Sequence, residues 1–120
     1  MPTLPARLTL TLAGAFALFA AAPASAASFD CAKVTGADEK AICADRTLND
    51  KDVRMALLYE LDLRFLPMGG RDALRREQYD WLVARRKCGA NRTCLMRSYD
   101  GRVATLRRII DERVYPQGPF

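Results

Sequence analysis

The sequence predicts an all-α fold: a small disulfide-stapled bundle of three main helices plus one short N-terminal helix. The chain has 120 residues, 50% of them hydrophobic, which suits one small domain and is too apolar for a disordered chain. Apolar residues recur at helical spacing, and no stretch shows the alternation of a β-strand. Four cysteines in so short a chain supply the covalent staples that a small core needs.

The first 26 residues are predicted to be a secretory signal peptide. Residues 8–22 carry no charge, and Pro23 and the small residues Ala24-Ser25-Ala26 follow, which is the pattern of a signal peptidase site. The uncharged run is shorter than the about 20 residues that a membrane span needs. We therefore expect cleavage after Ala26 and a periplasmic or extracellular protein with no lipid anchor and no transmembrane anchor.

All four cysteines, Cys31, Cys43, Cys88 and Cys94, lie in the mature part of the chain. An even number in a small exported domain indicates two disulfides, with three pairings open. We favour the local pairing, Cys31–Cys43 with Cys88–Cys94, which would contribute roughly 2–3 kcal/mol per bond. The spacing fits no common zinc site and includes no C-x-x-C motif, so we expect no metal and no cofactor.

The helices follow from their start and stop residues. Thr35 and Asp38 resemble a capping pair for a short helix over about 37–44, and Asn49 is the expected cap of a second helix over about 50–66. The segment 67–70, Pro-Met-Gly-Gly, is expected to form the turn before the next helix.

The third main element is expected over about 71–87, where Gly89 stops it. An elbow over 89–93 then offers Asn91 or Thr93 as the cap of a last helix over about 94–114. The helical domain is thus predicted to span 27–115, and residues 116–120 to form a C-terminal tail.

Two opposite charges interrupt the apolar faces of the second and third helices. At 100° per residue, Asp52 lies in the middle of one face and Arg85 in the middle of the other. In an antiparallel hairpin these two residues lie at the same level. We predict a buried Asp52–Arg85 ion pair, because either charge alone would be costly there. A structural lock is favoured over a catalytic role, since no nucleophile or second carboxylate joins the pair.

The predicted core includes the large side chains Tyr59, Trp81, Leu82, Leu95 and Tyr99. A second apolar stripe on the helix over 50–66, formed by Leu57, Leu61 and Phe65, lies nearly opposite the first. It serves either core packing or a partner, and the small size of the domain favours core packing.

Charge and residue types narrow the function classes. Residues 71–120 hold 12 bases against 6 acids, which would suit anionic envelope glycans or lipids. The charges are spaced as helix-surface pairs, so no nucleic-acid partner is expected. The chain has no histidine, which excludes Ser-His-Asp and Cys-His catalysis, and we expect a protein that is not an enzyme.

Several short motifs follow one another along the mature chain. They are Phe29-Asp30-Cys31-Ala32, then Glu39-Lys40-Ala41-Ile42-Cys43, then Leu48, Asp52, Met55 and Tyr59, then Gln78, Trp81, Leu82, Arg85, Cys88 and Gly89, and finally Cys94-Leu95, Tyr99, Arg102 and Leu106. In this order they resemble the LprI-like family of bacterial exported proteins, also called DUF1311, over about residues 29–108.

The resemblance implies a small, exported, disulfide-bonded helical domain that inhibits lysozyme. Such an inhibitor would act by occluding the muramidase cleft, which is lined by carboxylates. Either the acidic N-terminal half of the domain faces the enzyme, or an arginine enters the cleft and pairs with these carboxylates. Arg92, on the elbow between Cys88 and Cys94, is the residue best placed for this contact. The alternative is an envelope-interaction module whose basic C-terminal half binds anionic glycan or lipid.

Overall fold

The computed structural model describes residues 27–118 and confirms the all-α prediction for that range. Its helices are α1 (Ala37–Ala44), α2 (Arg46–Phe65), α3 (Met68–Arg86) and α4 (Arg92–Ile109). The last helix continues as a π-helical turn, Ile110–Val114, and a 3-10 turn, Tyr115–Gln117. Helical backbone therefore reaches into the predicted tail. The predicted signal peptide, residues 1–26, lies outside the described residues.

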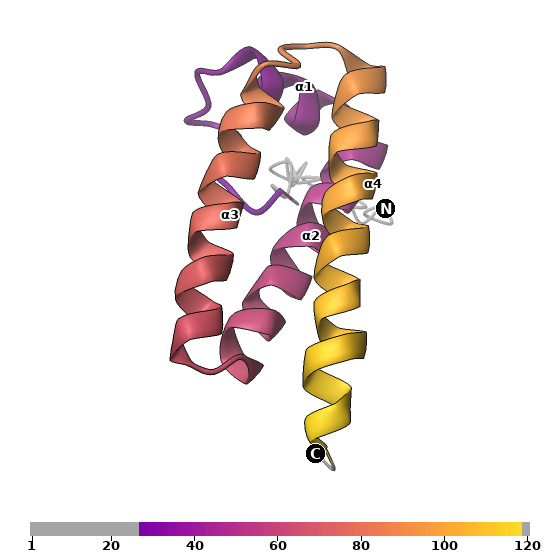
Figure 1. Cartoon of the computed structure of the whole chain (residues 1–120). Helices are drawn as coiled ribbons and strands as arrows, with labels where there is room; N and C mark the ends of the chain where they lie inside the picture. Colours follow the sequence, from indigo (N-terminus) through magenta and orange to yellow (C-terminus); the bar gives the residue numbers. More distant parts are fainter. Residues whose placement is uncertain (1–26, 119–120) are drawn as a thin grey trace, which may run out of the picture.

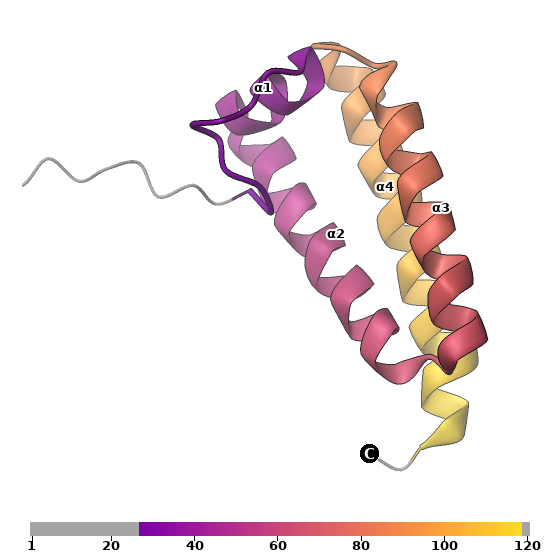
Figure 2. The same cartoon turned by 90° about the vertical axis from the view of Figure 1, so that its left-hand side faces the viewer.

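The three long helices run down, up and down beside one another in Figure 1, and α1 crosses one end of the bundle. Helices α2 and α4 make the closest helix–helix packing. Helices α2 and α3 separate as they leave their shared turn, and α1 closes the far end of the opening (Figure 2). The predicted antiparallel hairpin is therefore present, but it is splayed, and α4 supplies most of the packing that α2 needs.

Two of the predicted helix caps are wrong, although the short helix begins at the predicted residue, Ala37. The N-cap of α2 is Asp45, whose carboxylate accepts a hydrogen bond from the backbone N–H of Leu48 at 3.1 Å, and Asn49 is buried inside the helix. The cap of α1 is Gly36, which makes no side-chain hydrogen bond. Asp38 does not cap this helix, because its side chain turns into the core instead.

The connections between the long helices are shorter than expected. Pro67 is the N-cap of α3, and the residues from Met68 to Gly70 form the first turn of that helix instead of a loop. At the other end of α3 the stop is as predicted, with Gly89 at a φ of 51°, a left-handed conformation that favours glycine. Asn91 caps α4 by accepting the backbone N–H of Cys94 at 2.9 Å, which confirms one of the two predicted caps.

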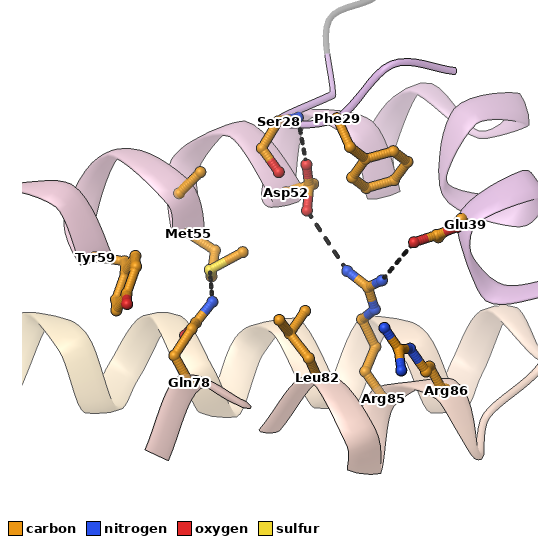
Figure 3. Close-up of a pocket in the computed structure, with 11 residues that line it drawn as sticks. Ser28, Phe29, Glu39, Asp52, Met55, Tyr59, Gln78, Leu82, Arg85 and Arg86 are labelled. Carbon is orange, nitrogen blue, oxygen red and sulfur yellow. Dashed lines mark hydrogen bonds and ion pairs between the residues drawn. The ribbon is translucent and has the colours of Figure 1, made fainter. Parts of the chain in front are cut away.

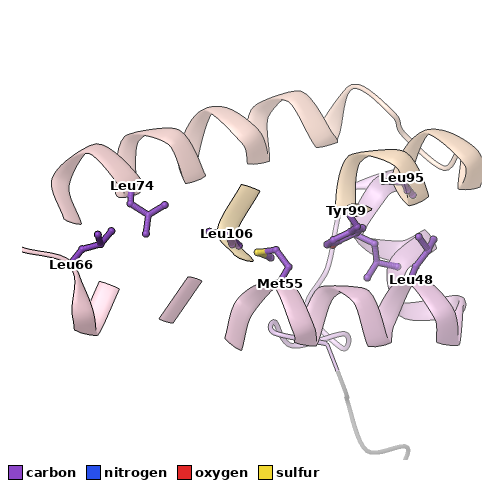
Figure 4. Packing of buried hydrophobic residues seen from close by; sticks show 8 residues of the cluster. Leu48, Met55, Leu66, Leu74, Leu95, Tyr99 and Leu106 are labelled. Atoms are coloured by element: carbon purple, nitrogen blue, oxygen red, sulfur yellow. The ribbon is translucent and has the colours of Figure 1, made fainter. Parts of the chain in front are cut away.

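The core runs along the axis between the three long helices (Figure 4). Leu95 and Tyr99 are fully buried, as predicted, whereas Tyr59, Trp81 and Leu82 are only partly buried. The other fully or nearly fully buried hydrophobic residues are Ile42, Leu48, Met55, Leu66, Leu74, Leu106 and Val114.

The second stripe of α2 does not pack into the core as we expected. Leu57 and Phe65 remain largely exposed, and Leu61 is partly buried. The reason is that α4 lies against a different side of α2, and only the C-terminal turns approach Leu61 and Phe65. No helix within residues 27–118 is long and apolar enough to cross a membrane.

Both disulfides have the predicted local pairing. The Cys31–Cys43 bond joins the lead-in segment to α1, with 5.8 Å between the two Cα atoms. The Cys88–Cys94 bond closes the connection between α3 and α4, with a Cα–Cα distance of 5.5 Å. Disulfides form and persist in oxidising compartments, so the pairing agrees with a protein that folds outside the reducing cytosol.

Candidate functional site

A buried charge network ties the four helices together. Each helix contributes one member: Asp38 from α1, Asp52 from α2, Arg85 from α3 and Tyr99 from α4. The Arg85 guanidinium donates from Nε to Asp38 Oδ2 at 3.1 Å, and its Nη2 lies 3.0 Å from the same oxygen. Its Nη1 donates to the Tyr99 hydroxyl at 3.0 Å, and that hydroxyl donates to Asp52 Oδ1 at 2.8 Å.

The predicted Asp52–Arg85 ion pair is present but is not a direct hydrogen bond. The distance from Arg85 Nη1 to Asp52 Oδ1 is 3.8 Å, and both side chains are buried (Figure 3). The hydroxyl of Tyr99 bridges the two charges, and the carboxylate in direct contact with Arg85 is Asp38. Sequence reasoning missed the contact of Asp38 with Arg85. Helix periodicity places residues of α2 and α3 at the same level, but it does not give the orientation of the short helix α1 relative to them.

Aromatic rings surround the guanidinium of Arg85. Its Cζ lies 5.6 Å from the ring centroid of Trp81, 5.8 Å from that of Phe29 and 6.0 Å from that of Tyr99. Cation–π attraction of this kind offsets part of the desolvation of a buried cation. The same burial raises the pKa of the Tyr99 hydroxyl well above its usual value, and the nearby charge of Asp52 raises it further. Tyr99 therefore stays protonated and keeps donating to Asp52.

The N-terminal lead-in closes the network on its open side. The backbone N–H of Ser28 donates to Asp52 Oδ2 at 2.6 Å, so both oxygens of this carboxylate accept hydrogen bonds (Figure 3). The opening between α2 and α3 forms a cleft of about 280 Å³, and Asp52 and Arg85 line it together with Met55, Tyr59 and Gln78. The charges of the network are thus held by fixed partners, which suits a lock on helix packing.

Charge also marks the surface of the disulfide-stapled end, a name used here for α1, the connection between α3 and α4, and the first turn of α4. Arg92 donates from Nε to Asp45 Oδ2 at 2.6 Å, and its side chain is 58% exposed. This hydrogen bond lowers the pKa of Asp45, and the N-cap bond from Leu48 lowers it further. The hydrogen bond to Asp45, which lies outside α4, therefore fixes the direction of the Arg92 side chain.

A second buried pair, which sequence reasoning missed, lies on α2 and α4. Asp62 and Arg102 are both buried, and neither oxygen of Asp62 has a hydrogen-bond partner among the described residues. Burial raises the pKa of Asp62 to about 6, against the attraction of Arg102, which lowers it. Arg102 itself donates to the Gln78 amide oxygen at 2.9 Å. The sequence signal for the burial of Asp62 is that it lies one helical turn from the apolar residues Leu58 and Leu66, on the same side of α2.

The described residues offer no group of three or more His, Cys, Asp or Glu side chains that could hold a metal ion. No protein-family model, no curated protein and no solved structure matches this chain. The resemblance to the LprI-like family therefore stays a prediction based on its ordered motifs.

Proposed function

We propose that this protein is an exported, non-enzymatic binding protein that inhibits lysozyme by occluding the muramidase cleft with its disulfide-stapled end. The observation that carries the proposal is the concentration of rigid features at that end. Both disulfides lie there, next to the exposed Arg92, and the hydrogen bond from Arg85 to Asp38 ties α1 to the last turn of α3. A surface that is rigid before binding loses less conformational entropy when it binds.

The chemistry of Arg92 suits a carboxylate-lined target. Its bond to Asp45 uses Nε, so the two terminal nitrogens of the guanidinium have no partner among the described residues. These two nitrogens form the fork that binds a carboxylate in a bidentate way. Glycoside hydrolases that cleave peptidoglycan carry a pair of carboxyl groups at the scissile bond. Arg92 would enter that site while Asp45 keeps its side chain directed outward.

The test is a titration of the oxidised chain 27–120 against several classes of lysozyme acting on purified peptidoglycan. We expect saturable inhibition, with Arg92→Ala weakening it at least about tenfold, the size of one charge-assisted contact. The matched control is Arg97→Ala, which removes an exposed arginine from the same helix, α4. Absence of inhibition by the unmodified protein across all classes would contradict the proposal, and equal inhibition by both variants would remove Arg92 from it.

A second candidate is an envelope module whose basic C-terminal half binds anionic glycan or lipid. Its support is the excess of bases over acids in residues 71–120. Burial removes Arg85 and Arg102 from that surface, which leaves a weaker positive field than the sequence suggests. Binding to an anionic polymer would collapse as salt rises from about 0.05 to 0.5 M, whereas a packed inhibitor interface would weaken less.

A further inference from the structure

Four of the six exposed large apolar side chains of the described residues lie on α2 or beside it, and the other two, Met68 and Tyr79, belong to α3. Val53, Leu57 and Phe65 on α2 are 42%, 56% and 49% exposed, and Tyr115 beside them is 65% exposed. Leu61, Phe65 and Tyr115 line a hollow of about 200 Å³ at the end of this row. A continuous row of this kind is typical of an interaction surface, whereas single exposed apolar residues are ordinary.

The row belongs to the face of α2 that points away from the bundle. At 100° per residue the centre of this face is Leu57, directly opposite the buried Leu48 and Leu66. Val53 and Leu61 lie one turn away on either side of Leu57. Asp50 and Arg64 lie two turns away on the same face, and both are exposed. We call these five residues the α2 outer face.

We propose that the α2 outer face binds a second copy of this chain, with the two α2 helices packed antiparallel about Leu57. A twofold axis at Leu57 brings residues that are equally far from it to the same level. Val53 of each copy then lies opposite Leu61 of the other, and Leu57 packs against its own counterpart. The same operation places Asp50 of each copy opposite Arg64 of the other. The face is thus complementary to itself in charge, and its apolar residues meet apolar residues.

The existing contacts of Arg64 do not oppose this arrangement. Its pair with Glu60, at 2.5 Å, joins two exposed side chains one turn apart on the same helix. Exposed pairs of this type contribute about 0.3–0.5 kcal/mol, so Arg64 exchanges partners at little cost. Residues 50–65 span about 22 Å of helix, which buries less than the about 800 Å² per partner of a standard interface. We therefore expect a weak dimer with a dissociation constant in the micromolar range.

The first experiment is analytical ultracentrifugation of the oxidised chain 27–120 over concentrations from about 5 µM to about 1 mM. We expect a monomer–dimer equilibrium that Leu57→Asp abolishes. Tyr79→Asp is the matched control, because it places the same charge on an exposed aromatic residue of α3, and it should leave the equilibrium unchanged. A chain that stays monomeric throughout the range overturns the proposal, as does a Leu57→Asp variant that still dimerises.

The second experiment tests the register by charge exchange. Asp50→Arg and Arg64→Asp should each weaken dimerisation at least about fivefold, because each places like charges together twice. The variant that carries both changes should return to within about twofold of the unmodified chain, since the opposite charges meet again. Arg75→Asp on α3, which breaks the exposed Asp72–Arg75 pair, is the control and should have no effect. If the double variant dimerises no better than the single ones, the antiparallel register about Leu57 is wrong.

Discussion

Replacing Asp62 by Asn should make this protein more stable at neutral pH, because the buried carboxylate destabilises the folded state. Both of its oxygens lack hydrogen-bond partners among the described residues, and burial raises its pKa from 3.8 to about 6. In the unfolded chain this carboxyl releases its proton near the lower value. Between the two values the folded state binds more protons, so the free energy of unfolding falls as pH rises through this window.

The size of the effect follows from the shift. A difference of about two pKa units corresponds to about 3 kcal/mol at 1.36 kcal/mol per unit. The original chain loses this much free energy of unfolding once the pH is above the pKa of Asp62 in the folded state. Asn does not ionise. The difference in free energy of unfolding between Asp62→Asn and the original chain should therefore be nearly constant below about pH 4 and should then grow by about 3 kcal/mol up to pH 7.5. Any constant offset reports the altered packing, and only the part that changes with pH reports the carboxylate.

Urea unfolding of the oxidised chain 27–120 at a series of pH values measures this difference. The single tryptophan, Trp81, provides the fluorescence signal, since its ring contacts that of Tyr99 at a centroid distance of 5.3 Å. The control is Asp80→Asn on the exposed surface of α3, which should change stability by less than about 0.5 kcal/mol. A difference between Asp62→Asn and the original chain that stays flat with pH would refute the reasoning. It would mean that Arg102 compensates the burial of Asp62 in full.

The charge network yields two further predictions, both measured by urea unfolding at pH 7. Arg85→Met should lower the free energy of unfolding by about 3–5 kcal/mol, because it leaves Asp38 and Asp52 buried without their cation. A loss below about 1 kcal/mol would show that the two acids find other partners. Tyr99→Phe should cost about 1–3 kcal/mol, since one hydroxyl satisfies both Arg85 and Asp52, whereas Tyr79→Phe on the surface should cost nothing measurable.

The features that the sequence predicted correctly are local ones. Helical spacing of apolar residues places Leu95 and Tyr99 on the inner side of α4, and short separations between cysteines favour the pairing that forms. A hairpin with a short turn also places Asp52 and Arg85 at one level, within 3.8 Å of each other. These predictions succeed because they depend on the period of the helix and on the length of the chain between two residues.

Only the tertiary structure decided which helices cover which faces. The sequence by itself marks two apolar stripes on α2. In the structure α4 covers one of them and Leu57 on the other stays exposed, which depends on how the three long helices pack together. The same packing turns Asp38 inward to meet Arg85 and buries Asp62 near Arg102. The physical reason is that residues from separate helices meet according to the angles between helix axes. Periodicity within one helix does not specify those angles.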